Sequence, residues 1–428
     1  MAPRTEADKD DGWRYGLRAL RFRNYRLFFG GQSLSLIGTW MTRLATSWLV
    51  YRLTGSAWLL GVTGFASQIP SFFLGPFAGV WVDRLDRHRV LVATQVLSMV
   101  QSLALAVLAL SHRITVSEII WLSVFQGLVN AFDMPARQAF LPQMVERRED
   151  LPNAIALNSS MVNASRLVGP SLAGLVIAGY GEGTCFLIDG LSYLAVIASL
   201  LLMRVRVQQV RRAKVGVLTE LHEGWRYVTR FPPARNILLL LALVSFVGMP
   251  YTVLMPIFAA RILGGGAHTL GFLMGATGIG ALVSAAWLAS RKSVLGLLRV
   301  IPRVAALFGL SLVAFGFSRW LPLSLTLLLF TGFGMMQQMA AGNTILQTVV
   351  DEDKRGRVMS YYAMAFAGTM PFGSLLAGWL AERLGAPTTL ALGGTVCLLG
   401  AAWFLTGMPG MRRALRPIYT ELGILRGR

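Results

Sequence analysis

Charge, lysine and cysteine are all scarce in this chain of 428 residues. Only 14% of its residues are charged, whereas an average soluble domain carries roughly a quarter. Lysine occurs at four positions only, so arginine supplies nearly all of the positive side of a net charge of +20. Hydrophobic residues make up 54% of the chain, and its mean hydropathy is +0.57. This composition argues against a soluble protein and indicates a membrane protein.

The residues that usually carry enzymatic chemistry are few and dispersed. Cys185 and Cys397 both lie inside apolar runs, so neither is expected to form a disulfide or to bind a metal. No HExxH, GxSxG or phosphate-loop motif occurs, and we therefore expect no enzyme, no metal and no cofactor. Positive charge lies in short clusters between apolar runs, which argues against a nucleic-acid partner. The histidines are scattered: His88, His112, His222 and His268.

Twelve apolar stretches are long enough to cross a bilayer core of about 30 Å, which takes roughly 20 helical residues. Most are rich in Gly, Ala and Ser, which lets membrane helices approach one another closely. The sequence therefore predicts an all-α integral membrane protein embedded in a lipid bilayer. The predicted spans are 27–51, 57–81, 90–110, 117–137, 155–179, 183–203, 236–260, 268–290, 300–318, 320–344, 358–381 and 388–408.

Positive charge is distributed unevenly between alternating loops. If the N-terminus is cytoplasmic, 33 of the 40 Lys and Arg residues fall in cytoplasmic segments and five in the opposite loops. The remaining two, Arg43 and Arg166, lie at membrane depth. This bias follows the positive-inside rule and predicts that both termini are cytoplasmic. The N-terminal segment is polar and basic and is not expected to act as a signal peptide.

The chain divides into two halves that repeat. Gly169 and Gly174 recur 204 residues later as Gly373 and Gly378. Two six-helix halves related by duplication are typical of transporters that rock about a central site. The segment between them is predicted to form an amphipathic helix on the inner membrane face, with a disordered linker as the alternative. The predicted units are a cytoplasmic tail at 1–26, six-helix bundles at 27–203 and 236–408, the linker at 204–235 and a cytoplasmic tail at 409–428.

The segment "GVWVDRLDRHR" joins the second span to a tight cluster of charge. It resembles the signature of the loop between spans two and three in the major facilitator superfamily. Trp81 stands where that signature usually has Leu, and Asp86 where it usually has Gly. The matching positions are Gly79, Asp83, Arg84, Arg87 and Arg89.

Asp83 is expected at the cytoplasmic end of span two, where it can face the positively polarised N-terminus of another helix. The segment "DEDKRGRVMS" before span eleven offers such an N-terminus, with Arg355 and Arg357 beside it. A charge latch of this kind would hold the halves closed on the cytoplasmic side and would break when they rock. The alternative is a plain positive-inside anchor.

The fifth span contains "SRLVGPSLAG", which resembles the antiporter signature of exporters in the same superfamily. Small residues and a proline make a bent, closely packed helix, and generic packing explains the pattern equally well. A third signature, in span four, is incomplete because Ser123 stands where an arginine is expected, three residues before Gln126. That departure puts an arginine-based coupling scheme in doubt. The residues that match the antiporter signature are Gly169, Pro170, Ala173 and Gly174.

Longer segments resemble the enterobactin-exporter and macrolide-efflux group of the superfamily. They include "FRNYRLFFGGQSLSLIGTWM", "FDMPARQAFLP" and "NTILQTVVDEDKRGRVMS", and with similar segments they extend over nearly the whole chain. The resemblance implies a bacterial inner-membrane exporter of bulky amphipathic compounds that is driven by proton antiport. It does not identify the cargo.

Charged residues inside a membrane are costly and are therefore functional candidates. At 1.5 Å per helical residue, Arg43, Arg166 and Asp189 are predicted at a similar depth, where opposite charges would offset each other's desolvation. Asp133 is predicted near the cytoplasmic end of span four, four residues before Arg137. We expect protonation of Asp189 or Asp133 to be coupled to rocking of the halves. The alternatives are a static buried ion pair for Asp189 and a simple boundary residue for Asp133.

If the superfamily plan applies, spans one, four, seven and ten line a central cavity. Methionines adapt to irregular shapes and amides form neutral hydrogen bonds, while Asp133 is the acidic residue of this set. That composition favours neutral, anionic or large mixed cargo over simple organic cations, although packing is the alternative for each residue. The candidates are Gln32, Trp40, Gln126, Asn130, Phe246, Met249, Tyr251, Met255, Gln337, Gln338 and Asn343.

The leading hypothesis is a secondary exporter of small molecules that works by alternating access and uses the proton gradient. We expect a monomer in the bacterial inner membrane. The alternatives within transport are an uncoupled facilitator and a lipid or lysolipid flippase. A membrane sensor that kept the fold but lost transport is a further alternative.

Overall fold

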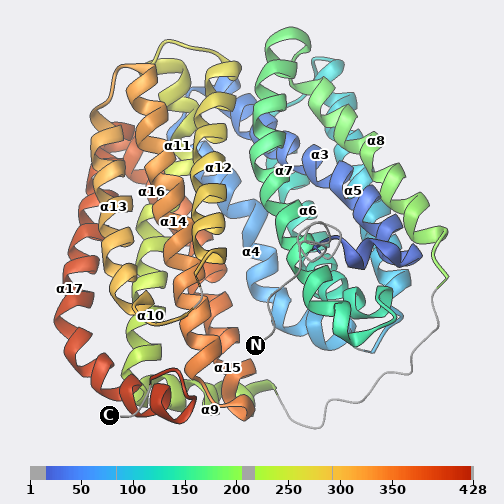
Figure 1. Cartoon of the computed structure of the whole chain (residues 1–428). Coiled ribbons are helices and arrows are strands. Elements are labelled where there is room, and N and C mark those ends of the chain that lie inside the picture. The colour runs from blue at the N-terminus through green and yellow to red at the C-terminus, as the bar shows by residue number, and fades with distance from the viewer. Residues whose placement is uncertain (1–15, 83, 205–216, 292, 426–428) are drawn as a thin grey trace, which may run out of the picture.

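The computed structural model describes residues 16–82, 84–204, 217–291 and 293–425, and every regular element in these ranges is helical. Figure 1 shows two helical bundles side by side, one coloured blue to green and the other yellow to red. The first bundle comprises η1 (Arg18–Arg21), α3 (Arg23–Thr54), α4 (Ala57–Val82), α5 (Arg87–Leu110), α6 (Val116–Phe140), η2 (Leu141–Met144), η3 (Arg148–Asp150), α7 (Leu151–Tyr180) and α8 (Glu182–Leu201).

The second bundle follows α9 (Val217–Arg230) and has two interrupted spans. Its seventh and eleventh spans contain π-helical turns, which are uncommon and often mark functional positions. Its elements are α10 (Pro232–Leu243), η4 (Val244–Gly248), α11 (Tyr251–Ile257), η5 (Phe258–Ile262), α12 (Ala267–Ala289), α13 (Leu297–Phe317), α14 (Leu321–Val349), α15 (Glu352–Ala363), η6 (Met364–Gly368), α16 (Met370–Leu384) and α17 (Ala386–Glu421).

Eleven helical runs in the described residues are long and apolar enough to cross a membrane. α3 is not among them, because Gly, Ser and Thr make up ten of its 32 residues. It nevertheless packs against α7 and α8 inside the first bundle and is the twelfth helix of the pattern. The predicted fold class, twelve helices in two six-helix halves, is therefore confirmed.

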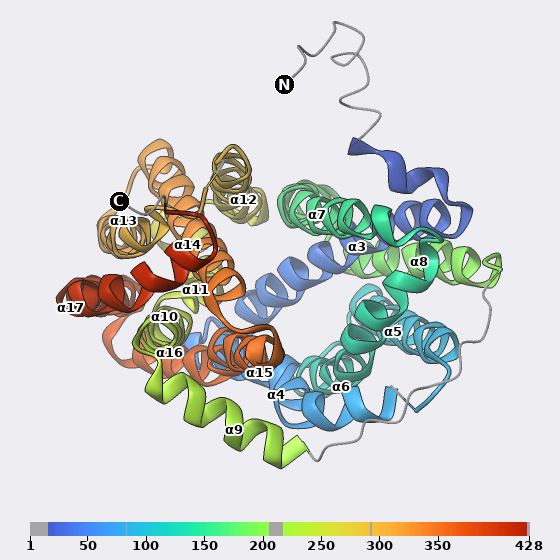
Figure 2. The same ribbon diagram turned by 60° about the horizontal axis from the view of Figure 1, so that its bottom comes forward.

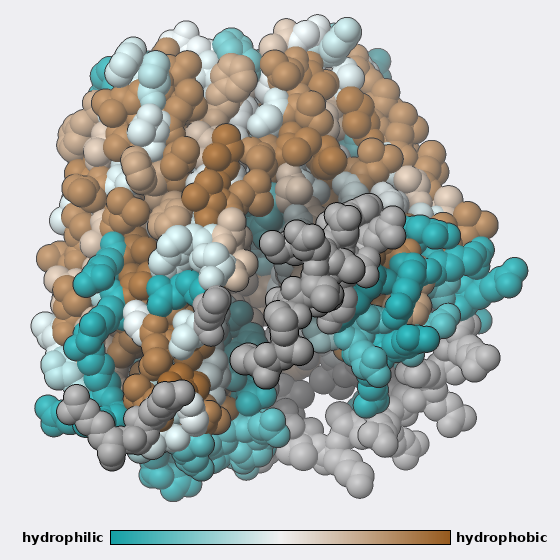
Figure 3. Space-filling view, viewed as in Figure 1, coloured by the Kyte–Doolittle hydropathy of each residue, from teal (hydrophilic) through white to brown (hydrophobic). Residues whose placement is uncertain are grey.

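The two ends of the molecule differ in polarity. The Asn24 side chain at the start of α3 donates a hydrogen bond to the Arg204 carbonyl after α8, at 3.0 Å. Figures 1 and 2 show α9 lying across the same end of the molecule, along the second bundle. We call this the α9 end and the other the opposite end. In Figure 3 hydrophilic residues gather at the α9 end, below a broad hydrophobic belt.

Two pairs of helices join the bundles: α4 with α16, and α7 with α12. Each pair has a glycine crossing. A Cβ atom at Gly174 would lie 3.0 Å from the Cα of Gly271, and one at Gly378 would lie 2.8 Å from the Cα of Gly61. Because Gly174 and Gly378 are related by the 204-residue repeat, the duplication places an equivalent close contact in each interface.

The linker and the C-terminal segment are more structured than their composition suggests. α9 packs against α15, where Glu223 and Arg357 form an ion pair of 2.6 Å. Val228 of α9 is buried, whereas Trp225 is exposed. α17 continues to Glu421, so that much of the segment predicted as a tail at 409–428 is helical. Residues 205–216 of the linker lie outside the described residues.

Candidate functional site

The bundles touch each other from the opposite end down to the middle of the molecule. Glu382, near the end of α16, accepts hydrogen bonds from the Trp58 backbone N–H at 3.0 Å and from the Ser56 hydroxyl at 3.2 Å. One side chain of the second bundle thus caps the start of α4 in the first. Deeper in the same interface, the ring centroids of Phe72 and Phe372 lie 5.5 Å apart.

Toward the α9 end the same helix faces separate. Gly79 lies 18 residues, five full turns, beyond Gly61 on α4, yet nothing lies within 4 Å of the position of a Cβ there. On α7, Ala156 lies 18 residues before Gly174 on the interface face, and it is exposed together with Ser160. The space between the bundles is therefore closed at the opposite end and open toward the α9 end.

The charged loop after α4 contains a helix cap that the sequence analysis did not predict. Asp86 accepts hydrogen bonds from the backbone N–H groups of His88 and Arg89 and is the N-cap of α5. It also forms an ion pair of 3.4 Å with Arg89. Arg87 donates to the Ala139 carbonyl at 3.4 Å, and Arg84 is exposed. Asp83, the acidic member of the expected latch, lies outside the described residues.

The two arginines expected to complete the latch both have partners in or beside the second bundle. Arg357 pairs with Glu223 of α9 at 2.6 Å. Arg355 lies 4.0 Å from Glu352 on its own helix, and its Nε is buried without a hydrogen-bond partner. Between described residues of the two bundles, no ion pair is formed. The latch therefore stays a prediction. In this structure Arg357 is paired with Glu223 instead.

The residues that match the antiporter signature lie where α7 meets its neighbours. A Cβ at Gly169 would lie 2.5 Å from the Cβ of Trp40, so only glycine lets α3 come this close. The Pro170 carbonyl and Gly174 contact Gly271 of α12. Ala173 is fully buried. The motif thus joins α7 to the first helix of its own bundle and to the other bundle.

Two of the three charges predicted at similar depth meet at one aromatic ring. The guanidinium carbons of Arg43 and Arg166 lie 4.7 Å and 5.1 Å from the centroid of Trp40. Arg43 is exposed although it lies well inside α3, whereas the Nε of Arg166 is buried without a partner. Leu167, the residue after Arg166, packs against Gly278 of the second bundle.

Asp189 is buried close to this cluster but is not paired with an arginine. Its Oδ2 accepts a hydrogen bond of 2.6 Å from the Ser102 hydroxyl, and its Oδ1 is buried without a partner. The Cβ of an alanine at position 38 would lie 2.7 Å from that Oδ1, so Gly38 makes room for the carboxylate. Arg43 interacts electrostatically with Asp189 without forming an ion pair within the described residues.

Asp133 is a fully partnered carboxylate. Its Oδ1 accepts hydrogen bonds from the Thr94 hydroxyl at 2.9 Å and from the Gln95 amide at 2.7 Å. Its Oδ2 forms an ion pair with Arg137 one turn along α6. Because every contact of Asp133 lies in the first bundle, a change in its protonation would first alter the packing of α5 against α6.

Sequence reasoning missed the polar face of α5. Its members recur every three or four residues, and that spacing in "TQVLSMVQS" was the available signal. The face connects the two buried carboxylates: its first members bind Asp133, and its last binds Asp189. Between them, Ser98 accepts a hydrogen bond from the Gln126 amide at 3.1 Å. The members of the face, all buried, are Thr94, Gln95, Ser98, Gln101 and Ser102.

The cavity candidates of the first bundle are partly accessible. Trp40, Gln126 and Asn130 are half-buried, and Gln126 donates to Asn130 at 3.1 Å. Gln32 is buried, with 2% of its surface exposed. These positions belong to α3 and α6, as the superfamily plan requires for helices that line the centre.

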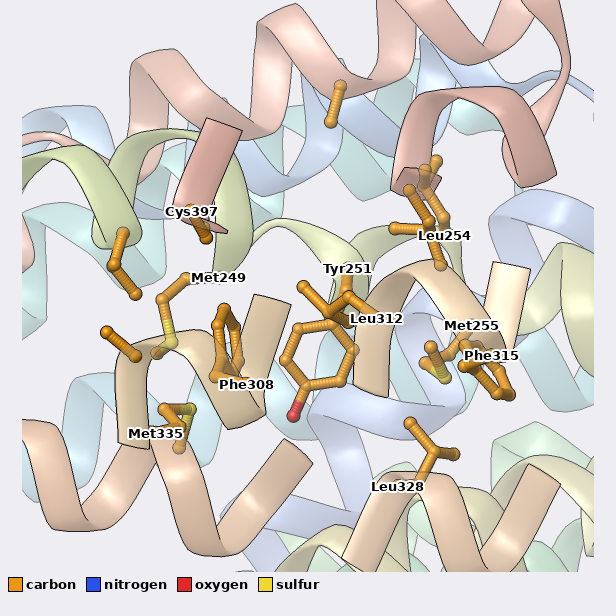
Figure 4. Close-up of a cluster of buried hydrophobic side chains, with 14 of the residues drawn as sticks. Met249, Tyr251, Leu254, Met255, Phe308, Leu312, Phe315, Leu328, Met335 and Cys397 are labelled. Atoms are coloured by element: carbon orange, nitrogen blue, oxygen red, sulfur yellow. The ribbon is translucent and has the colours of Figure 1, made fainter. Parts of the chain in front are cut away.

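The cavity candidates of the second bundle lie mostly in its packed core. Figure 4 shows Met249, Tyr251 and Met255 among Phe308 and Phe315, and all three are buried. Among the amides, Gln337 accepts from Ser284 at 2.8 Å, Gln338 donates to the Leu240 carbonyl at 3.5 Å, and Asn343 accepts from Gln347 at 3.0 Å. Phe246 and Asn343 are half-buried.

Comparison with known proteins finds relatives along most of the chain. A family model described as "Transmembrane secretion effector" matches residues 16–415. The staphyloferrin A transporter of Staphylococcus aureus is 26% identical over 89% of this chain and 96% of its own length. The multidrug efflux pump Tap of Mycolicibacterium fortuitum is 28% identical over 89% and 95%. Macrolide efflux protein A of Streptococcus pyogenes is 24% identical over 88% and 95%.

Solved transporters share the fold at low sequence identity. A bacterial homologue of the human lysosomal transporter Spinster, in an inward-facing and unoccupied conformation, superposes with a TM-score of 0.69 at 13% identity. That match covers 94% of this chain and 98% of the other. The D-xylose–proton symporter has a TM-score of 0.67 at 14% identity and covers 90% and 96%. At these identities the likeness shows the fold alone.

Proposed function

Because the chain belongs to the transmembrane secretion effector family of the major facilitator superfamily, it is a multi-pass membrane transporter, and we propose that it exports bulky amphipathic small molecules by proton antiport. The related proteins are transporters, and three of them are named for a siderophore, for multidrug efflux and for macrolide efflux. Those names support a siderophore or drug as cargo here. We propose a monomer as the working unit.

The charge distribution supports a bacterial inner-membrane location with the α9 end in the cytoplasm. In that orientation 33 of 40 Lys and Arg residues are cytoplasmic. The space between the bundles then opens inward, because the glycine crossings and the Glu382 contacts lie at the periplasmic end. An exporter in this conformation can take up cargo from the cytoplasm before it rocks to the other side.

Asp189 is the observation that carries proton coupling. Asp189 is buried at membrane depth and one of its oxygens has no partner, so its charged form is costly. A change in the helix contacts around it therefore changes how readily it binds a proton. Asp189 belongs to α8 and faces Gly38 of α3 and Ser102 of α5. Its charge partly balances that of Arg43. We propose that a periplasmic proton neutralises Asp189, that Arg43 loses its balancing charge, and that the changed α3–α8 contact favours the inward-open arrangement.

The first test is efflux from a bacterial strain that lacks its main efflux pumps. Cells expressing the protein are loaded with siderophores, macrolides and dyes, and efflux is followed with and without a protonophore. We expect export of at least one compound that stops when the protonophore is added. Export that persists would support an uncoupled facilitator instead, and no export from cells with folded protein in the membrane would count against transport of these classes.

The coupling residue is tested in inverted vesicles with an imposed pH gradient. Asp189→Asn removes the titratable group and keeps the size and the hydrogen bond from Ser102. We expect gradient-driven transport to disappear while exchange of cargo without a gradient continues. Asp150→Asn is the matched control, because Asp150 is a buried carboxylate paired with Arg18 outside this cluster. Full gradient-driven transport by Asp189→Asn would move the proposal to Asp133.

A further inference from the structure

The ring of Trp40 lies beside two cations that come from different helices. Arg43 of α3 and Arg166 of α7 both have their guanidinium carbons close to its centroid, at 4.7 Å and 5.1 Å. Gly169, three residues after Arg166, contacts Trp40 directly, so the backbone spacing of α7 and α3 brings the two cations together. The aromatic face interacts favourably with each guanidinium, but it carries no negative charge.

Neither arginine has an acidic partner. No ion pair or hydrogen bond to either side chain is formed within the described residues, and the Nε of Arg166 is buried and unpaired. The two guanidinium groups repel each other, and Asp189, the carboxylate that interacts with Arg43, already accepts from Ser102. The cluster therefore holds two positive charges and at most one negative charge.

An excess positive charge at this depth has a large desolvation cost unless an anion balances it. Arginines that serve packing alone are normally paired within the protein. Here the cation–π contacts with Trp40 form no hydrogen bond, so they leave the N–H donors of both guanidinium groups unused. Such planar donors suit the paired oxygens of a carboxylate or a phosphate.

The cluster lies where a transported molecule can reach it. Arg43 is exposed, and the space between the bundles is open toward the α9 end. Leu167, the residue after Arg166, packs against Gly278 of α12, where a Cβ would lie 3.0 Å from the Leu167 Cα, so the cluster lies at the boundary between the two bundles. A group bound there would contact residues whose relative positions change when the bundles rock.

We propose that Arg43 and Arg166, held at the ring of Trp40, bind an anionic oxygen group of the transported molecule, a carboxylate or a phosphate. The inference rests on the proposed function, because it assigns a chemical feature to the cargo of the same protein. It selects, among amphipathic compounds, those that carry such a group beside a flat apolar part. It also places cargo binding next to proton coupling, because Arg43 belongs to the anion site and responds to the charge of Asp189.

The test is a binding measurement with two dyes that share one ring system. Fluorescein carries a free carboxylate and is anionic at neutral pH, whereas rhodamine 6G has that carboxyl group esterified and is cationic. Fluorescence anisotropy is measured with the purified full-length protein in neutral detergent. We expect fluorescein to bind and rhodamine 6G to bind at least about tenfold more weakly, because a charge-assisted hydrogen bond is lost.

The variants assign the site. Arg43→Gln and Arg166→Gln are each expected to weaken fluorescein binding about tenfold and to leave rhodamine 6G unchanged or tighter. Arg43→Lys keeps the charge without the planar donors and should fall between these and the native protein. Arg113→Gln, at an exposed loop position, is the matched control. The proposal would be overturned if monodisperse glutamine variants bound fluorescein as tightly as the native protein. If a glutamine variant does not fold, the lysine variant is measured in its place.

Competition identifies the oxygen group. Citrate and inorganic phosphate are each tested for displacement of fluorescein, and the stronger competitor tells a carboxylate site from a phosphate site. The measurement is repeated in nanodiscs of phosphatidylcholine with and without phosphatidylglycerol. Displacement by phosphatidylglycerol alone would assign the arginines to a lipid headgroup and overturn a cargo site.

Transport of the same dyes separates this inference from the proposed function. Arginine-dependent binding without uptake into inverted vesicles would leave the anion site standing and count against export. Uptake of fluorescein that the glutamine variants do not reduce would leave export standing and remove the anion site. Uptake that falls with the arginines and also needs the pH gradient supports both.

Discussion

Gly174 of α7 and Gly271 of α12 lie backbone against backbone at the boundary between the two halves. A Cβ on Gly174 would lie 2.8 Å from the Ala267 carbonyl and 3.0 Å from the Gly271 Cα. Since both neighbours are backbone atoms, no side chain can move aside to make room. The repeat-related contact between Gly378 and Gly61 has nearly the same geometry, so the closed opposite end, which we propose to be periplasmic, depends on two glycine crossings.

Gly174→Val is therefore expected to open the periplasmic end. Overpacking of a close contact costs about 1–3 kcal/mol. That cost would lower the ratio of molecules in the present arrangement to molecules in the alternative one by a factor of about 5 or more. Nitroxide labels at Ile155→Cys and Ser290→Cys, exposed positions near the cytoplasmic ends of α7 and α12, report the change by electron–electron distance measurement. Both native cysteines are buried, which favours selective labelling. We expect shorter distances in the variant.

Gly179→Val is the control for that experiment. It lies on the same helix, but nothing lies within 4 Å of a Cβ there. Unchanged distances in Gly174→Val, or equal changes in both variants, would show that the crossing does not set the conformation.

Glu382 is expected to be a second determinant of the closed opposite end. Its carboxylate caps the start of α4 from the other bundle, and the cap must be released when the bundles part at this end. Capping at a helix N-terminus contributes about 1 kcal/mol, so Glu382→Ala should favour the outward-open arrangement about fivefold. The same labelled pair measures this shift.

The control for Glu382 is another capping glutamate at the same end. Glu118 forms a capping box with Thr115 within α6, and its contacts stay inside one bundle. Glu118→Ala should lower the stability of the protein without changing the distance distribution. If both variants change the distances alike, the effect is general destabilisation and not the release of a contact between bundles.

The fold could be predicted because its determinants are local. The spans follow from the long apolar runs, and their orientation follows from the arginines between them. The division into two halves follows from the 204-residue repeat, and none of these signals requires knowledge of tertiary contacts. Even α3, which is rich in Gly, Ser and Thr, is predicted as a span because the apolar stretch at 27–51 is long enough to cross the bilayer. Helix ends were harder to place, as α17 shows, because amphipathic turns continue beyond the apolar core.

The site was less predictable because membrane helices are apolar on most faces. Met249 and Met255 were assigned to the centre by span number alone, and they lie among Phe308 and Phe315 in the core of one bundle. The capping role of Glu382 depends on a contact with a residue more than 320 positions away, which no local pattern encodes. The polar face of α5 did have a local signal, because its side chains recur at helical spacing.

Asp86 explains one departure from the superfamily signature and gives a stability prediction. The signature usually has glycine at this position, and Asp86 caps α5 through two backbone N–H groups. Asp86→Gly should cost only a few tenths of a kcal/mol, whereas Asp86→Ala should cost about 1 kcal/mol, because alanine neither caps nor adapts. Reversible unfolding in sodium dodecyl sulfate measures both. An equal loss in the two variants would mean that the ion pair with Arg89, and not the cap, accounts for the effect.

Glu223 and Arg357 form an ion pair that competes with the predicted cytoplasmic latch. In this structure Arg357 is held by Glu223 of α9 at 2.6 Å, and the predicted latch would need the same arginine when the α9 end closes. Glu223→Gln frees Arg357 and is expected to favour closure, whereas Arg357→Gln removes it from both arrangements. Since a surface ion pair contributes about 0.2–1 kcal/mol, we expect Glu223→Gln to raise the closed fraction up to about fivefold.

The contrast between these two variants distinguishes a latch from a plain anchor. If Arg357 forms the latch in the closed arrangement, Glu223→Gln should shorten the distance between the labels at positions 155 and 290. Arg357→Gln should not shorten it, either alone or in the double variant with Glu223→Gln. If Arg357 only anchors α9, both single variants release α9 equally and give the same distance distribution. Lys354→Gln is the control for net charge, because its ion pairs are with Asp351 and Asp353 at the start of α15, and its contact with α9 is the ring of Tyr227, whose centroid lies 5.2 Å from the ammonium. A response of Lys354→Gln equal to that of Glu223→Gln would attribute the shift to net charge at the membrane surface.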